Sequence, residues 1–271
     1  MIPELWVKGN CFTQRVAQNT FQKCRHLLKW KNNESILEFG AADGNTSVTS
    51  VLPELPKDYK EYVLTDVSPD MVEYMKKNLN IPRSKIMQHD IGTIKLQDEL
   101  KNKFDHIISI FVMHMLPNPR QGFININKML KPGGQAVVSF VERLPIDDAF
   151  HNLFQYSKWS RYGHMLSPHY YSDNVEESYK KDIDAAGFKS YTLDFEKDYQ
   201  VFFEDDNVLR TVLTAGNTVL PRIPEELRDE YLIDYHKEVE NSGRILYTER
   251  EGQKISYVKI NIFVSVMTKF E

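Results

Sequence analysis

The sequence lacks long hydrophobic runs and has only two cysteines, Cys11 and Cys24. Its longest apolar stretch, IISIFVMHML, is shorter than the ~20 residues that a membrane-spanning helix requires. The cysteines form no CxxC or Cys/His spacing that would bind a metal. We therefore expect no metal site and no membrane insertion. Free thiols are typical of a reducing compartment, so we expect a cytoplasmic protein.

An excess of positive charge is also missing. The formal net charge is -4, and no block of Lys and Arg stands out as a nucleic-acid footprint, so we expect no nucleic-acid partner. The first residues, MIPELWVKGN, lack a basic start followed by an apolar segment, which argues against a signal peptide. A length of 271 residues suits one α/β domain with insertions, as a monomer or a homodimer.

Short apolar runs alternate with helix-like segments from residue 36 to about residue 141. This order predicts βαβ units and a mostly parallel sheet with helices on both faces. The strands are expected at residues 36–39, 62–65, 85–88, 107–112, 136–141, 191–195 and 255–267. The helices are expected at residues 12–28, 46–52, from 69 onward, 95–100, 120–130 and 174–187, and a turn is expected at LKPGGQ.

Two segments do not follow this alternation. Residues 143–172 are aromatic and irregular, and residues 203–250 look helical. We expect both to form a cap over one end of the sheet and not a separate domain. The prediction is therefore a single domain over residues 1–271, with a core at residues 34–142 and cap insertions at about 143–172 and 203–250.

The stretch ILEFGAADGN combines a buried strand with a loop of small residues. Glu38 lies near the strand's end, and Gly40 and Gly44 let the backbone approach a ligand closely. A helix starting near Thr46 would offer free N–H groups to a carboxylate. The three-glycine dinucleotide fingerprint GxGxxG is absent, and Asp43 would repel a pyrophosphate. The loop would instead tolerate the cationic amino acid tail of S-adenosylmethionine.

Acids also follow the next two strands. Asp66 can accept hydrogen bonds from both hydroxyls of a ribose, and Asp90 can accept one from an exocyclic amine. In an open α/β sheet, ligands bind at the carboxyl ends of the strands where the strand order switches. Together with the region from Ser109 to Met113, these positions predict a site for a nucleoside with a small charged tail.

Five segments in order resemble the motifs of class I S-adenosylmethionine-dependent methyltransferases: LEFGAADGN, TDVSPDMVEYMKKN, MQHDI, FDHIISIFVMHML and LKPGG. Ala42 stands where the middle glycine of the first motif is usual. The resemblance implies a Rossmann-like fold with a seven-stranded, mostly parallel sheet and a helical substrate cap. It implies that Glu38, Gly40 and Asp43 hold the methionine end, Asp66 the ribose, and Asp90 with Ile91 the adenine. Gly44, Val67 and Ser109 are further cofactor-binding candidates.

A more specific resemblance runs nearly end to end. NCFTQRVAQ, FVMHMLPNPRQGFININKMLKPGG, SKWSRY and VLPRIPEELRDEYLIDY are similar to segments of the insect juvenile hormone acid methyltransferases. That family methylates the carboxylate of farnesoic acid or juvenile hormone acid. The resemblance therefore implies a small apolar sesquiterpenoid acid as substrate and a place in juvenile hormone biosynthesis. It also assigns the aromatic cap, including Trp159 and Tyr162, to binding the lipid tail.

The family has His-Trp after the fourth strand, whereas this chain has His114-Met115. The family's Trp helps to hold the substrate carboxylate, and Met cannot donate that hydrogen bond. A family Gln near the N-terminus aligns with Thr13 or, after a slip of one residue, with Gln14. By resemblance, Gln14 and His114 are the catalytic candidates, and Thr13 and Met115 join them at the substrate.

Other interpretations of these residues stay open. A carboxylic acid with a pKa near ~4 is already ionised at neutral pH, so His114 is expected to orient the substrate and not to act as a base. The change at Met115 leaves room for a methyltransferase of the same fold with another acceptor. It also leaves room for a non-catalytic protein that keeps a terpenoid or cofactor pocket. A single His, acid or aromatic residue at any of these positions is otherwise ordinary packing or surface.

Overall fold

One mixed sheet organises the computed structural model, which describes residues 1–163, 166–203 and 205–270. Its strands are β1 Ser35–Phe39, β2 Glu61–Asp66, β3 Ser84–Gln88, β4 Phe104–Ile110, β5 Leu130–Val141, β6 Ser190–Phe203, β7 Ile245–Arg250 and β8 Gln253–Thr268. The order across the sheet is β3-β2-β1-β4-β5-β8-β6, and β7 pairs with β8 off this path. Strands β1 to β5 are mutually parallel, whereas β8 runs antiparallel to β5, β6 and β7.

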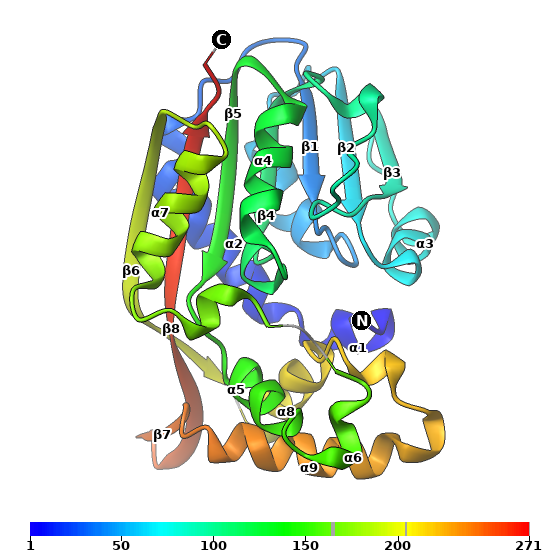
Figure 1. Ribbon diagram of the computed structural model, residues 1–271, viewed down its shortest axis with the longest axis vertical. Helices are drawn as coiled ribbons and strands as arrows, with labels where there is room; N and C mark the ends of the chain where they lie inside the picture. Colours follow the sequence, from blue (N-terminus) through cyan, green and yellow to red (C-terminus); the bar gives the residue numbers. More distant parts are fainter. Residues whose placement is uncertain (164–165, 204, 271) are drawn as a thin grey trace.

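Some helices cover the two faces of the sheet and others form a cap. The helices of the described residues are α1 Pro3–Gly9, α2 Cys11–Cys24, α3 Pro69–Asn78, α4 Pro119–Met129, α5 Pro145–Leu153, α6 Ser157–Ser160, α7 Val175–Ala185, α8 Asp206–Ala215 and α9 Arg228–Asn241. Helices α4 and α7 lie side by side over one face and α2 lies behind the sheet (Figure 1). The core under α4 and α7 is separate from the core under α2, and the latter continues into the cap.

Local sequence signals explain where several helices begin. Ser68 caps α3 by accepting a hydrogen bond from the backbone N–H of Met71, and Pro69 occupies the first helical position. Asn118 and Asn174 cap α4 and α7 in the same way. Strand β1 is buried along its whole length, as expected of a central parallel strand covered on both faces.

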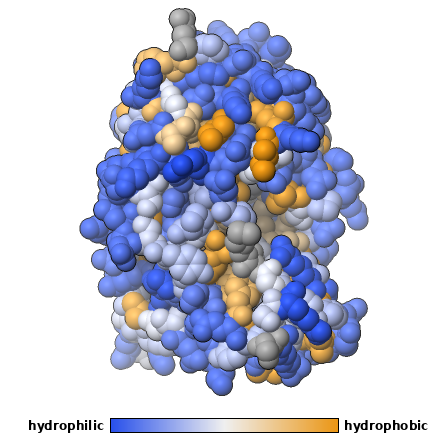
Figure 2. Space-filling model, viewed as in Figure 1, coloured by the Kyte–Doolittle hydropathy of each residue, from blue (hydrophilic) through white to orange (hydrophobic). Residues whose placement is uncertain are grey.

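The cap lies beyond the carboxyl ends of the parallel strands (Figure 1). It contains α5, α6, α8, α9 and the β7 hairpin, and α1 lies between it and the sheet. Helix α1 packs closely on α8, because a Cβ on Gly9 would come within 2.7 Å of the Cβ of Ala215. The face seen in Figure 2 is hollowed at mid-height, between the sheet layer and the cap.

The predicted fold class is confirmed: the sheet is mostly parallel, with helices on both faces. The strand count was wrong, because the described residues form eight strands and not seven. The additional strand is β7, which lies inside the segment 203–250 that was expected to be helical. The domain boundaries remain predictions.

Three local expectations also differ from the structure. The expected helix at 46–52 is a π-helical turn, Ser47–Val51, and such turns are frequent at functional sites. The expected turn at LKPGGQ is the start of β5, where a Cβ on Gly134 would lie 2.9 Å from the carbonyl oxygen of Asp105. Strand β4 ends at Ile110, because Phe111 adopts a left-handed φ of 61°.

Candidate active site

The loops after β1 and β4 meet at the centre of the sheet, where β1 lies between β2 and β4. Gly40 begins the first loop with a φ of +71°, a conformation that side chains disfavour. A Cβ on Gly40 would come within 2.1 Å of the Cγ2 of Val112 in the second loop. The glycine is therefore required for the contact between the two loops, which is the switch point where α/β sheets bind ligands.

Asp66 holds the β1 loop from the end of β2. Its carboxylate accepts hydrogen bonds of 2.9 Å from the backbone N–H groups of Ala42 and Ser68. Ala42 has a left-handed φ of 51°, so this anchor fixes a strained loop. Asp66 is 4% exposed, and burial raises its pKa. Each oxygen keeps lone-pair capacity for a ligand hydroxyl.

Asp43 is tied to the start of α2 by a short polar chain. The Nδ2 of Asn10 donates to the Oδ2 of Asp43 at 2.7 Å, and the Nε2 of Gln14 donates to the Oδ1 of Asn10 at 2.8 Å. The backbone N–H of Asn45 donates to the other Asp43 oxygen at 3.3 Å. Burial raises the pKa of Asp43. Two predicted site residues, Gln14 and Asp43, are thus joined through a third that the sequence did not single out.

Glu38 lies inside the sheet and does not face the loop surface. It is 2% exposed, and the hydroxyl of Tyr62 on β2 donates a hydrogen bond to it. Burial raises the pKa of Glu38 to about 7. Ser109 is also fully buried, and its hydroxyl donates to the backbone oxygen of Phe39 at 3.1 Å. Glu38 and Ser109 therefore support the loop after β1 from inside the sheet.

The expected adenine side of the site combines an exposed and a buried apolar residue. Val67 is 61% exposed although it directly follows β2, and Ile91 is 4% exposed. Asp90 is exposed, and its Oδ1 accepts a hydrogen bond of 2.8 Å from the backbone N–H of Gly92. Asn125 on α4 donates to the backbone oxygen of Ile91 at 2.6 Å, which fixes this loop.

His114 lies in the turn after β4, where its ring contacts Phe111 on one side and a small polar cavity on another. Desolvation lowers its pKa to about 3, so the imidazole is neutral at physiological pH. Its Nδ1 is buried and has no hydrogen-bond partner. The rings of His114 and Phe111 are perpendicular, with their centroids 5.9 Å apart, and Phe111 stacks on Phe12 of α2 with a centroid distance of 5.3 Å. Met115 lies in the same turn and is partly buried.

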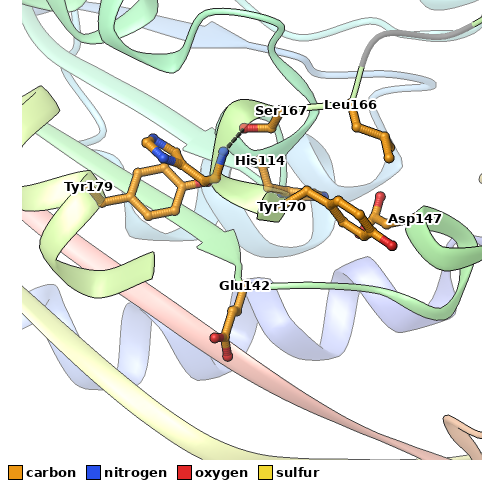
Figure 3. A pocket seen from close by; sticks show the side chains of 8 residues that line it. His114, Glu142, Asp147, Leu166, Ser167, Tyr170 and Tyr179 are labelled. Atoms are coloured by element: carbon orange, nitrogen blue, oxygen red, sulfur yellow. Dashed lines mark hydrogen bonds between the residues drawn. The ribbon is translucent and has the colours of Figure 1, made fainter. Parts of the chain in front are cut away.

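A small cavity of about 10 Å³, enough for about one water molecule, lies beside His114. Figure 3 shows Glu142 at the end of β5, Asp147 and Tyr170 from the cap segment and Tyr179 from α7 around it. Burial raises the pKa of Asp147 to about 7. His169 also lines the cavity, and its Nε2 lies 2.9 Å from the Oδ2 of Asp182 on α7.

Trp159 and Tyr162 are not brought to His114. Trp159 is 2% exposed, and its indole N–H donates to Asp234 of α9 at 2.7 Å. Its ring packs edge-on against Tyr231 at 5.2 Å and lies 6.2 Å from Tyr162. These rings form the interior of the cap. Thr13 is 8% exposed, on the face of α2 that packs on the sheet.

The donor set fits S-adenosylmethionine. Two buried carboxylates, Asp43 and Asp66, flank the bare loop and favour a ligand with positive charge. Val67 offers an exposed apolar surface beside Asp66, as a stacked base requires. Residues 37–136 match the family described as a methyltransferase domain.

Residues 37–136 therefore carry a methyltransferase domain, on the fold of the class I methyltransferases. It is similar to juvenile hormone acid O-methyltransferases over most of its length. The Bombyx mori protein is 28% identical over 86% of this chain and 84% of its own, and the Drosophila melanogaster protein is 28% identical over 85% and 80%.

Solved methyltransferase structures share the fold at low identity. A putative methyltransferase from Bacillus halodurans has a TM-score of 0.54 at 18% identity, covering 92% of this chain and 98% of its own. Phosphoethanolamine N-methyltransferase 2 from Haemonchus contortus, solved in complex with S-adenosyl-L-methionine, has a TM-score of 0.51 at 13% identity, covering 93% and 52%.

Sequence reasoning missed several residues that shape the site of this methyltransferase. Asn10 falls inside the quoted stretch NCFTQRVAQ, but its bond to Asp43 spans 33 residues. Tyr62 lies two residues before the β2 partner of Glu38 and gives no signal of its own. His169 and Asp147 come from cap segments whose path no local pattern predicts. In the described ranges no cluster of His, Cys, Asp and Glu suits a metal, and no helix there could span a membrane.

Proposed function

We propose that this methyltransferase transfers the methyl group to a carboxylate oxygen of a small apolar acid. A terpenoid acid such as farnesoic acid or juvenile hormone acid is the preferred candidate, with a role in juvenile hormone biosynthesis. The observation that supports this most is His114, a neutral, half-buried imidazole whose Nδ1 is buried and unpartnered, in the turn after β4. The names of the insect relatives support the same acceptor chemistry.

His114 can donate one hydrogen bond to a carboxylate oxygen without adding charge to the site. Because its pKa is about 3, it does not become an imidazolium between pH 5 and pH 9. A free carboxylic acid has a pKa near ~4, so the acceptor arrives as an anion and needs no base. The apolar neighbours Phe111 and Phe12 keep water away from the acceptor oxygen.

S-adenosylmethionine, when bound, supplies an electrophilic methyl group. Asp43 and the backbone at Gly40 would hold its methionine end, Asp66 its ribose, and Asp90 with Ile91 its adenine. Gln14 reaches the same loop through Asn10 and would lie between cofactor and acceptor. These side chains would contribute mainly by holding the methyl donor and the acceptor close together and aligned, which can supply ~7–11 kcal/mol of barrier reduction.

A second candidate function is methylation of a different acceptor on the same fold. It is favoured by Met115, which stands where the resembling family has Trp and donates no hydrogen bond to a carboxylate. His114 would then be the only side chain of its turn able to bind a polar acceptor. A hydroxyl or amine acceptor needs deprotonation, and a histidine with a pKa of about 3 is a weak base for it.

A panel of acceptors distinguishes these functions. Purified protein is incubated with S-adenosylmethionine carrying a deuterated methyl group, and products are identified by mass spectrometry. The panel pairs farnesoic acid with farnesol and with the corresponding amine, so that only the head group changes. The proposal expects a labelled methyl ester from the acid alone. Labelled ether or N-methyl product without ester would refute the carboxylate assignment.

A further inference from the structure

A groove of about 230 Å³ lies where α2, β6 and α8 meet. Its walls come from the first turn of α2, the last residues of β6 and the first turn of α8. The lining residues are Cys11, Phe12, Arg15, Val201, Phe202, Phe203 and Val208. Most of this lining is apolar, so filling the groove with apolar ligand atoms would be favourable.

The groove adjoins the acceptor site through two aromatic rings. Phe12 lines the groove and stacks on Phe111 at 5.3 Å, and Phe111 meets His114 at 5.9 Å. Phe12 and Phe111 therefore link the groove to His114 by ring contacts. An apolar chain laid from His114 across these two rings would contact aromatic surface on its way to the groove.

The cap aromatics that the family resemblance assigns to the tail are already occupied. Trp159 is 2% exposed and uses its N–H on Asp234, and its ring packs on Tyr231. Opening a slot there would require breaking these contacts. The groove at α2 needs no such rearrangement, because it is already open in the structure.

Charge in the groove is compatible with an acid. Arg15 is the charged side chain of the lining, no Asp or Glu belongs to it, and the ion pairs of the described residues do not include Arg15. Its Nη1 donates to the backbone oxygen of Phe202 at 3.3 Å. An approaching carboxylate therefore meets no like charge at the rim, whereas a cationic amphiphile would be repelled.

We propose that this groove binds the far end of the acceptor's apolar tail and sets the preference for chain length. The inference rests on the proposed function, because it places the tail of the acid whose carboxylate lies at His114. It assigns tail recognition to Phe12, Phe203 and Val208 and not to Trp159 and Tyr162.

Cys11 provides a direct binding test. The thiol lines the groove and is partly exposed, whereas Cys24 is buried with its pKa raised to about 12 and serves as the unreactive internal control. Alkylation of Cys11 by N-ethylmaleimide is followed by mass spectrometry in the presence of S-adenosylhomocysteine. We expect dodecanoic acid to slow alkylation at least ~10-fold, and hexanoic acid, which is too short to reach the groove, to have no effect.

A second measurement uses the acid chain-length series from hexanoic to dodecanoic acid. Over the lengths that enter the groove, kcat/KM should rise about fourfold for each methylene. Val208→Trp fills the groove from α8 and should abolish this rise. Asn207→Trp adds the same bulk one residue earlier on the exposed side of α8 and should keep the rise.

The outcomes separate the inference from the proposed function. Protection of Cys11 together with a rise that Val208→Trp abolishes supports both. Methyl ester formation with unprotected Cys11, or with the same rise in both Trp variants, overturns the groove and leaves the proposed function standing. Protection without any ester supports acid binding in the groove and refutes the proposed function. Neither protection nor ester refutes both.

Discussion

The hydrogen bond from Asn10 to Asp43 leads to a quantitative prediction for Asn10→Ala. The two side chains are 2% and 4% exposed, and the bond of 2.7 Å links the start of α2 to the cofactor loop. Removing a donor from a buried carboxylate costs ~1.5–3 kcal/mol. With an unfolding entropy of ~0.6 kcal/mol/K for 271 residues, Tm should fall by ~3–5 °C.

Cofactor binding should weaken as well, because the ligand must then order a loop that Asn10 no longer holds. Fixing one backbone residue costs ~1–2 kcal/mol, so Kd for S-adenosylhomocysteine should rise about 10-fold. Tm is measured by scanning calorimetry and Kd by titration calorimetry. The matched control is Asn19→Ala, also on α2, whose bond to Glu196 is only partly buried. It should shift Tm by less than ~2 °C and leave Kd unchanged. If Asn10→Ala behaved like this control, the anchoring role would be refuted.

Three further predictions concern pH, the acceptor and the cap. Glu38 has a pKa of 4.5 in the unfolded chain and about 7 in the folded one, so between these values the folded state holds a proton that the unfolded state releases. Glu38 therefore makes the free energy of unfolding decrease as pH rises from 4.5 to 7. Denaturant titrations of Glu38→Gln at several pH values should lack this part of the decrease, and a pH dependence equal to that of the wild type would contradict the prediction. Because His114 is neutral above pH 5, it adds no break of its own to the pH profile, so His114→Ala should lower kcat/KM by ~10–100-fold at every pH from 6 to 9; a break near pH 6.5 that His114→Ala removes would instead indicate a base. Asp148 accepts hydrogen bonds from Arg143, Arg244 and Tyr170, but both arginines stay partly exposed to water. Asp148→Ala should therefore lower the free energy of unfolding by ~1–3 kcal/mol in urea titrations, and an unchanged value would show that these contacts do not stabilise the cap.

Local signals predicted the parallel core well, because each is read within a few residues. Ser68 with Pro69 begins α3, and Gly187, with a φ of +91°, follows the end of α7. Asp66 also lies where the parallel neighbour β2 brings it, beside the loop that begins at Gly40. These placements follow from strand direction alone.

The β7 hairpin was missed for a physical reason. Strand β7 is mostly exposed or half-buried, so its sequence shows little apolar alternation. It forms because it pairs with the start of β8 across Glu251 and Gly252, which have φ values of 52° and 77°. Positive φ at both turn residues matches the twist of a two-residue hairpin, but Glu-Gly is a weaker signal for it than Asn-Gly.

Roles that depend on long-range contacts were also inaccessible to sequence reasoning. The sequence predicts Glu38 as a cofactor-binding residue, but nothing local in it predicts that Tyr62 donates a hydrogen bond to its carboxylate. It grouped Trp159 with the substrate, yet Asp234 on α9 fixes that indole in the cap interior. In both cases the residue type was informative about burial, and the partner that decides the role lies far away in the chain.

The central claim is that one site binds a nucleoside cofactor and an apolar acid together. The most direct measurement is calorimetric titration with S-adenosylhomocysteine, followed by titration of the complex with farnesoic acid. We predict one binding site for S-adenosylhomocysteine and one for farnesoic acid, and formation of the methyl ester when S-adenosylmethionine replaces S-adenosylhomocysteine. Binding of the nucleoside without the acid, and without ester, would contradict the carboxylate assignment while leaving the methyltransferase fold intact.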